Sequence, residues 1–168
     1  SRDTPVRVVL VDDQLLFRQS IAMIIDTEPG LTVVGEAGDG AEGFDVIMAT
    51  SPDVVLMDVR MPRLDGIEAT RRICQNPALG STRVLVLSMF ELDEYVFQAL
   101  QAGASGFLLK DTRPPDLLNA IKRTHDGESL FAPSILTRLI EHYISTSPHR
   151  AVTFPETDYR KLLTEREV

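Results

Sequence analysis

Short apolar runs alternate with amphipathic stretches along most of the chain. Runs rich in β-branched residues predict strands near residues 6–11, 32–36, 53–57, 83–87 and 106–109. Apolar positions at helical spacing predict helices near residues 14–27, 40–50, 65–75, 92–103 and 115–126. This rhythm indicates an α/β fold in which a five-stranded parallel sheet carries helices on both faces.

Polar residues at the expected helix ends agree with this pattern. Asp39 and Asp65 are each followed three residues later by a glutamate, which is typical of a capped helix start. Gly103 and Gly127 stand where helices should stop. We therefore interpret Asp65 as a helix cap and not as a ligand.

Beyond residue 131 the pattern changes. A further helix is expected from about Pro133 to Tyr143, and residues 145–160 then lose periodicity and gain two prolines, as in a linker. In the final segment, Thr164 and Glu167 have the spacing of a new capped helix. A helix that begins at a chain terminus suggests a truncated domain.

Composition narrows the functional classes. The chain has 168 residues and a net charge of −8, so it shows no basic footprint for nucleic acid. No apolar run is long enough to cross a membrane and no signal peptide is evident, which predicts a cytoplasmic protein without membrane contact. The single cysteine, Cys74, shares a helical register with Ile67 and is expected to be a small buried hydrophobe.

Three carboxylates follow two of the apolar strands. Asp12 and Asp13 close the first strand, and Asp58 closes the third. In a parallel sheet these ends meet at one edge, where open α/β sheets place their sites. Crowded like charges require a cation or a strongly raised pKa, and Mg²⁺ prefers carboxylate oxygens. We predict a magnesium site in which Asp13 and Asp58 bind directly and Asp12 holds a metal-bound water or orients the pair.

Two further polar residues end the neighbouring strands. Ser88 follows the fourth strand and Lys110 the fifth, so both should reach the same edge as the acids. A donor, a cation and an exposed carboxylate at Asp58 suit transfer of a phosphoryl group to that carboxylate. Each residue alone also fits an ordinary cap, turn or surface charge. Their joint placement favours the functional interpretation.

The motifs VVLVDD (8–13), LMDVRMPRLDG (56–66), Ser88 and GASGFLLK (103–110) resemble the receiver domain of bacterial two-component response regulators. The resemblance spans about Val6 to Leu130. It implies a flavodoxin-like, doubly wound five-stranded parallel sheet of order 2-1-3-4-5 with helices on both faces.

The resemblance also implies a phosphorelay function. Asp58 would accept a phosphoryl group from a phosphohistidine of a sensor histidine kinase, so the domain would catalyse only its own phosphorylation and dephosphorylation. Mg²⁺ would bind to Asp13, Asp58 and the backbone carbonyl of Arg60, with Asp12 assisting. Lys110 would pair with the phosphoryl oxygens.

Ser88 and Phe107 would form the switch, in which the serine moves to the phosphoryl group and the aromatic ring turns inward. Two residues depart from the commonest receiver pattern. Asp111 follows Lys110 where many receivers have proline, which leaves the loop geometry open, and Met89 is bulkier than usual beside the acceptor.

The Lys110–Asp111 pair and the final LTEREV (163–168) resemble the NarL/FixJ subfamily, whose output is a LuxR-type helix-turn-helix. The expected organisation is a receiver at 1–131, an additional helix and linker at 132–160, and the start of a truncated output domain at 161–168. DNA would be bound, and transcription regulated, only through that missing domain. A phosphorylation-linked homodimer is also expected, as is kinase docking near Leu15 and Leu16.

Two alternatives remain open on sequence. A haloacid-dehalogenase-like phosphohydrolase also uses a magnesium-bound aspartate, but it needs an acid two residues after the nucleophile, where this chain has Arg60. A receiver-like scaffold that is never phosphorylated has no need for the acidic cluster.

Overall fold

The computed structural model describes residues 4–146, which fall into two units that divide after Phe131. The first unit contains five strands: β1 (Val6–Val11), β2 (Leu31–Ala37), β3 (Val54–Asp58), β4 (Arg83–Ser88) and β5 (Gly106–Leu109). Its helices are α1 (Leu15–Asp26), α2 (Gly40–Thr50), α3 (Gly66–Gln75), the short 3₁₀ helix η1 (Pro77–Leu79), α4 (Asp93–Ala102) and α5 (Pro114–His125). The second unit contributes α6 (Pro133–Thr146).

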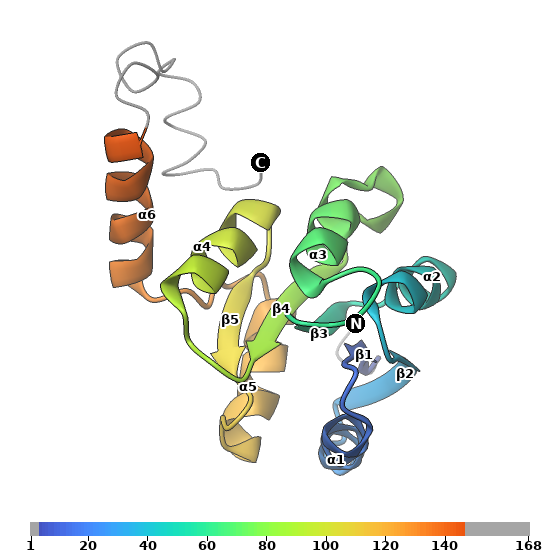
Figure 1. The fold of residues 1–168 in the computed structure, drawn as a ribbon. Coiled ribbons are helices and arrows are strands. Elements are labelled where there is room, and N and C mark those ends of the chain that lie inside the picture. The colour runs from blue at the N-terminus through green and yellow to red at the C-terminus, as the bar shows by residue number, and fades with distance from the viewer. Residues whose placement is uncertain (1–3, 147–168) are drawn as a thin grey trace. The chain divides into compact units, whose positions relative to one another are not determined.

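The five strands form one parallel sheet of order β2-β1-β3-β4-β5, which confirms the predicted fold and strand order. Figure 1 shows α1 and α5 on one face of this sheet and α2, α3 and α4 on the other. Strands buried on both faces can be apolar at every position. Strand β3 is an example, since all of its residues are buried, including its terminal aspartate.

The face under α1 and α5 holds a large apolar cluster. Alternate strand residues point to it, as Val8 and Leu10 do from β1, because successive side chains of a strand face opposite sides. They pack against Ile25 of α1 and Ile121 of α5, both fully buried. This core fixes the carboxyl ends of β1, β3 and β4 relative to one another.

Helix boundaries follow the predicted signals. The side chains of Asp39 and Asp65 accept the backbone N–H of Glu42 and Glu68 at 2.8 and 2.9 Å, so both are helix caps as expected. Gly103 ends α4 with φ of 103°, a left-handed conformation that favours glycine.

The prediction for Cys74 was wrong. Its side chain is exposed, whereas Ile67, Thr70 and Ile73 form the buried face of α3. Cys74 shares the direction of that face, but it is the last residue but one of α3, where its thiol donates to the backbone carbonyl of Gly103 at 3.3 Å. Helical register therefore does not by itself decide burial at the end of a helix.

The helix predicted at 133–143 is present and extends to Thr146, so the first two residues of the linker predicted at 145–160 are helical instead. The rest of that linker, from 147, and the helix start at 161–168 lie outside the described residues. Between residues 4 and 146, no helix is both long and apolar enough to cross a membrane.

Candidate phosphoacceptor and metal site

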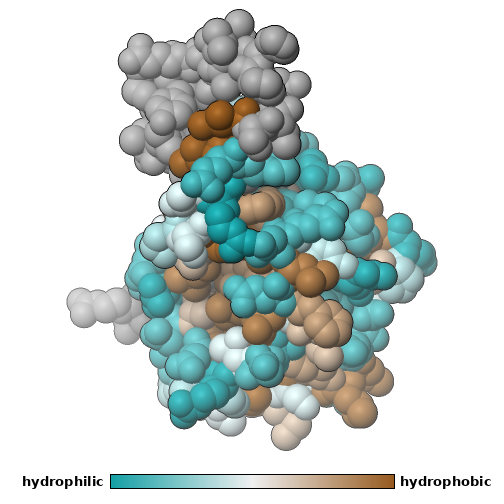
Figure 2. Space-filling view, turned by 60° about the vertical axis from the view of Figure 1, so that its left-hand side comes forward, coloured by the Kyte–Doolittle hydropathy of each residue, from teal (hydrophilic) through white to brown (hydrophobic). Residues whose placement is uncertain are grey.

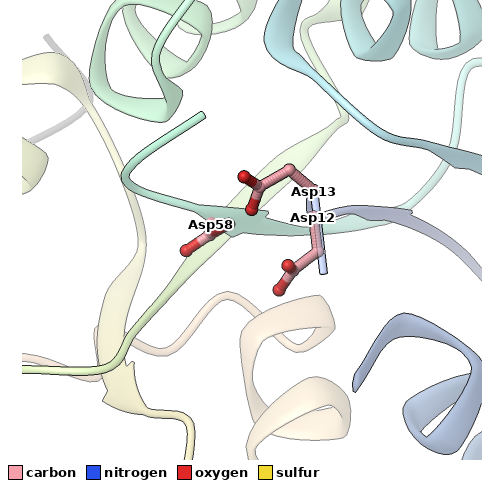
Figure 3. A group of neighbouring side chains, drawn as sticks. All are labelled: Asp12, Asp13 and Asp58. Atoms are coloured by element: carbon pink, nitrogen blue, oxygen red, sulfur yellow. The ribbon is translucent and has the colours of Figure 1, made fainter. Parts of the chain in front are cut away.

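Three acidic side chains gather where β1 and β3 end. Asp12 and Asp13 directly follow β1, and Asp58 is the last residue of β3, which pairs with β1 in parallel register. One carboxylate oxygen from each acid lies within 4.8 Å of the others. Figure 3 shows Asp12 and Asp13 turned to different sides, with Asp58 next to them. The structure therefore brings together the three acids predicted from sequence.

The three carboxylates have different surroundings. Asp12 and Asp58 are buried, with 5% and 6% of their surface exposed, while Asp13 is exposed. Both oxygens of Asp12 already have partners, since Oδ1 accepts the backbone N–H of Gln14 at 2.8 Å and Oδ2 forms an ion pair with Lys110 at the same distance. Asp12 thus has less capacity left for a metal than Asp13 or Asp58.

Lys110 supplies the cation of the site. Its ammonium Nζ lies 3.2 Å from Asp58 Oδ1, and its side chain is only 4% exposed. The lysine reaches this position because β5 lies beside β4, and its backbone N–H donates to the carbonyl of Ser88 at 2.8 Å. No cis peptide bond occurs between residues 4 and 146, so Asp111 follows Lys110 through a trans bond without displacing the lysine from the acids.

Burial changes the protonation of Asp58. Its pKa is raised to about 7, first by desolvation and then by the nearby negative charge of Asp12, while Lys110 acts in the opposite direction. The ionised form is therefore disfavoured in the metal-free protein. An additional cation near Asp58 and Asp13 would favour the carboxylate form, which is the nucleophilic one.

Ser88 ends β4, one residue beyond Leu87, which pairs in register with Asp58. Its hydroxyl donates to the carbonyl of Phe90 at 2.9 Å and accepts the Phe90 N–H at 3.2 Å. Phe107, the other predicted switch residue, lies half-buried in β5. The serine is thus engaged with the loop that leads to α4.

The loop between β3 and α3 is held at three points. Arg60 donates to the hydroxyl of Tyr95 on α4 at 2.8 Å, and Arg63 forms an ion pair with the α2 cap Asp39. Gly66 donates its N–H to the carbonyl of Val59 at 2.8 Å. These contacts fix the backbone just after Asp58, where the carbonyl of Arg60 was predicted to bind the metal.

Sequence reasoning missed several residues around the acids. Gln14 contacts Lys110, and the ring of Phe17 lies 4.8 Å from the ammonium nitrogen. Arg18 donates to the backbone carbonyl of Asp12 and pairs with Glu36 of β2 at 3.0 Å. The only available signal was their position in the turn and first helix after the two aspartates.

A family model for the response regulator receiver domain matches residues 8–122. The transcriptional regulatory protein YxjL of Bacillus subtilis is 44% identical over 135 residues, covering 80% of this chain and 61% of that protein. LiaR of the same species, also a transcriptional regulatory protein, is 36% identical over 164 residues, covering 95% of this chain and 77% of LiaR.

Solved structures agree with these relatives. The signal receiver domain of the response regulator NarL from Mycobacterium tuberculosis superposes with a TM-score of 0.71 at 39% identity, covering 74% of this chain and 99% of that one. A two-component response regulator of the LuxR family from Aurantimonas sp. gives a TM-score of 0.72 at 35% identity, covering 84% and 99%.

A five-stranded sheet of this order with acids at its carboxyl edge defines a receiver domain. The chain belongs to the response regulator receiver family, and its relatives are response regulators of the NarL/LuxR type. The phosphohydrolase alternative is not favoured.

Proposed function

We propose that Asp58 accepts a phosphoryl group from the phosphohistidine of a sensor histidine kinase. The observation that supports this most directly is the ammonium of Lys110, placed 3.2 Å from Asp58 Oδ1 and 2.8 Å from Asp12 Oδ2. Phosphoryl transfer depends mainly on positioning and on cations around the transferred oxygens. This distance supports a role in which Lys110 binds an oxygen of a phosphoryl group on Asp58.

The acidic cluster fits a magnesium ion. One oxygen from each of the three carboxylates lies within 4.8 Å of the others, and the positive charge of Lys110 offsets only part of their negative charge. Oxygen ligands are those that Mg²⁺ prefers. We propose that Asp13, Asp58 and the backbone carbonyl of Arg60 hold the ion, and that Asp12 assists. When bound, the ion would neutralise negative charge on the acids and on the phosphoryl oxygens.

The residues then have distinct roles in the transfer. An oxygen of Asp58 attacks phosphorus, a phosphorus–oxygen bond forms, and the phosphorus–nitrogen bond breaks so that the imidazole leaves with its electron pair. Lys110 exchanges its contact with Asp58 for one with a phosphoryl oxygen. The domain thereby acts only on itself, in phosphorylation and in slow dephosphorylation.

The switch follows from the new charge. A phosphoryl group on Asp58 adds strong acceptors, and Ser88 would move to donate to one of them. This movement breaks its two hydrogen bonds with Phe90, and Phe107 would turn inward. The apolar side chains of Met89, Phe90 and Leu92 are exposed on the loop between β4 and α4. Figure 2 shows apolar patches among hydrophilic side chains on the side that carries α4 and β5.

The signal would pass through protein partners in the cytoplasm. We propose that the kinase docks near Leu15 and Leu16, whose side chains are 53% and 79% exposed at the start of α1. The switched domain would form a homodimer and control a LuxR-type helix-turn-helix domain that binds DNA. The chain spans 61% of the length of YxjL and 77% of that of LiaR.

Mass spectrometry after treatment with a phosphorylated kinase and Mg²⁺ tests the proposal. We expect the mass of one phosphoryl group on the wild-type protein and none on Asp58→Asn. Uptake by both proteins would place the acceptor elsewhere, and uptake by neither would favour a scaffold that works by contacts alone. Leu15→Ala/Leu16→Ala should slow transfer from the kinase but not from acetyl phosphate.

A further inference from the structure

Lys110 is surrounded by three oxygen acceptors, of which one carries no charge. Besides Asp12 and Asp58, the side-chain oxygen of Gln14 accepts a hydrogen bond from Nζ at 2.9 Å. An ammonium has three hydrogens and no acceptor, so the amide must turn its oxygen to it. Lys110 thus forms two ion pairs and one hydrogen bond to a neutral oxygen.

The position of Gln14 is unusual for its place on the helix. It is the N-cap residue of α1, where a short polar side chain commonly accepts a hydrogen bond from the first turn. Here the side chain makes no such bond, and it extends instead to a lysine 96 positions away in the sequence. The geometry therefore serves Lys110 and not the helix.

Gln14 is also tied to the acids through its backbone. Its N–H donates to Asp12 Oδ1 at 2.8 Å, and Lys110 forms an ion pair with Oδ2 of the same carboxylate at 2.8 Å. Asp12, Lys110 and Gln14 thus each contact the other two. The aromatic side chain of Phe17 also borders the ammonium, with its ring centroid 4.8 Å from Nζ.

We propose that Gln14 is a positioning residue, which holds the ammonium of Lys110 in place while its contact with Asp58 is exchanged for a phosphoryl oxygen. The proposal rests on phosphorylation at Asp58. A neutral acceptor suits this role because it orients the lysine without adding a fourth negative charge beside the phosphoryl group. The positive charge of Lys110 then remains available to the incoming oxygens.

The test compares Gln14→Leu with Gln19→Leu, the same change at an exposed glutamine of the same helix. Beryllofluoride serves as the probe of the phosphoryl position, and calorimetry measures its binding with Mg²⁺ present. We expect Gln14→Leu to weaken beryllofluoride binding about threefold to tenfold, the range for the loss of one ordinary hydrogen bond. Gln19→Leu should bind like the wild type.

Two further readouts separate positioning from a general structural effect. Without metal or beryllofluoride, the NMR order parameter of the Lys110 Cε methylene should fall in Gln14→Leu and stay unchanged in Gln19→Leu. Mg²⁺ alone should bind to both variants with wild-type affinity, because Gln14 contacts no predicted metal ligand through its side chain except by way of Lys110.

The outcomes distinguish this inference from the proposed function. If the wild type binds no beryllofluoride, the proposal that Asp58 is phosphorylated is wrong, and so is the positioning role of Gln14 that depends on it. If the wild type binds the probe and Gln14→Leu binds it equally well, only the positioning role is wrong. An equal loss of Mg²⁺ affinity in Gln14→Leu would also overturn it, since the effect would then be on the acidic loop as a whole.

Discussion

The hydroxyl of Ser88 is joined to the backbone of Phe90 by two hydrogen bonds, one donated at 2.9 Å and one accepted at 3.2 Å. A serine hydroxyl has a single hydrogen to donate. It cannot donate to the Phe90 carbonyl and to a phosphoryl oxygen on Asp58 at the same time. Phosphorylation at Asp58 should therefore release the start of the loop that leads to α4.

Hydrogen exchange at the Phe90 amide measures this release. In the wild type, beryllofluoride with Mg²⁺ should speed exchange about fivefold, since a hydrogen bond contributes about 1 kcal/mol to local stability. Ser88→Ala should show fast exchange from the start and no further increase with the probe. Ser88→Thr keeps the hydroxyl and should respond like the wild type. An unchanged Phe90 amide in wild type with bound beryllofluoride would contradict the coupling.

The raised pKa of Asp58 makes the metal-free protein sensitive to pH. Folding raises this pKa from 3.8 to about 7, mainly by desolvation, so the folded state holds a proton that the unfolded state has already lost. The contribution of Asp58 to stability is thus greatest below pH 4, declines as pH rises toward 7, and is constant above it. Three pKa units correspond to about 4 kcal/mol, and allowing for local relaxation we expect ~2–3 kcal/mol.

Asp58→Asn removes the free-energy cost of ionising a buried carboxyl group. At pH 8 in EDTA we therefore expect this variant to be more stable than the wild type by ~2–3 kcal/mol. Urea unfolding at pH 4 and pH 8 measures the difference, which should nearly vanish at pH 4. Mg²⁺ provides the control, because a cation that neutralises the acids should reduce the difference in stability between Asp58→Asn and the wild type at pH 8. A gap of equal size at both pH values would show that the change acts through packing and not through ionisation.

The sequence predicted the acids because their position depends on local pattern. Asp12 and Asp58 each end an apolar strand, and parallel pairing of those strands was enough to bring them together. To predict that Lys110 lies close to these acids, one further assumption was needed, namely that β5 pairs with β4. The expected third strand ended one residue early, at Met57, because an aspartate in a fully buried strand is unusual without a site to hold it.

The residues that the sequence did not reveal depend on side-chain reach. Gln14 and Lys110 are 96 positions apart, and no periodicity relates them. The link between Arg60 and Tyr95 likewise joins a loop to a helix that lies beyond another strand. The prediction for Cys74 failed for a different reason, because a helical register gives the direction of a side chain but not whether neighbouring elements cover it at the end of the helix.

Asp13 should be the most important ligand that does not also accept the phosphoryl group. It is exposed, whereas one oxygen of Asp12 accepts a hydrogen bond and the other forms an ion pair. We expect Asp13→Asn to weaken Mg²⁺ binding about tenfold or more, and to reduce the stabilisation that Mg²⁺ gives in thermal unfolding accordingly. In EDTA the same variant should be slightly more stable than wild type, because one of three like charges is gone.

Asp45→Asn is the matched control for that change, as Asp45 is an exposed acid on α2 outside the cluster. It should leave Mg²⁺ binding unchanged in calorimetry. If Asp13→Asn also leaves the affinity unchanged, the ion is not held by the carboxylates that the structure gathers.

Gly66 limits how the chain can turn after Asp58. A methyl group at Gly66 would lie 1.7 Å from the backbone oxygen of Asp58, whereas one at Gly30 would meet nothing within 4 Å. Because the obstructing atom is backbone, Gly66→Ala can be accommodated only by moving Asp58 or the start of α3. We expect a loss of about 3 kcal/mol in the free energy of unfolding, and little change, within about 0.5 kcal/mol, for Gly30→Ala.

The same displacement should impair the site beyond its effect on stability. At a temperature where Gly66→Ala is still folded by circular dichroism, its beryllofluoride binding should be weaker than that of wild type, because Asp58 has moved relative to Lys110. Gly30→Ala controls for loss of a glycine as such and should bind normally. Wild-type stability and affinity in Gly66→Ala would mean that the β3–α3 loop can relax without moving the acceptor, contrary to the close contact between Gly66 and the Asp58 backbone.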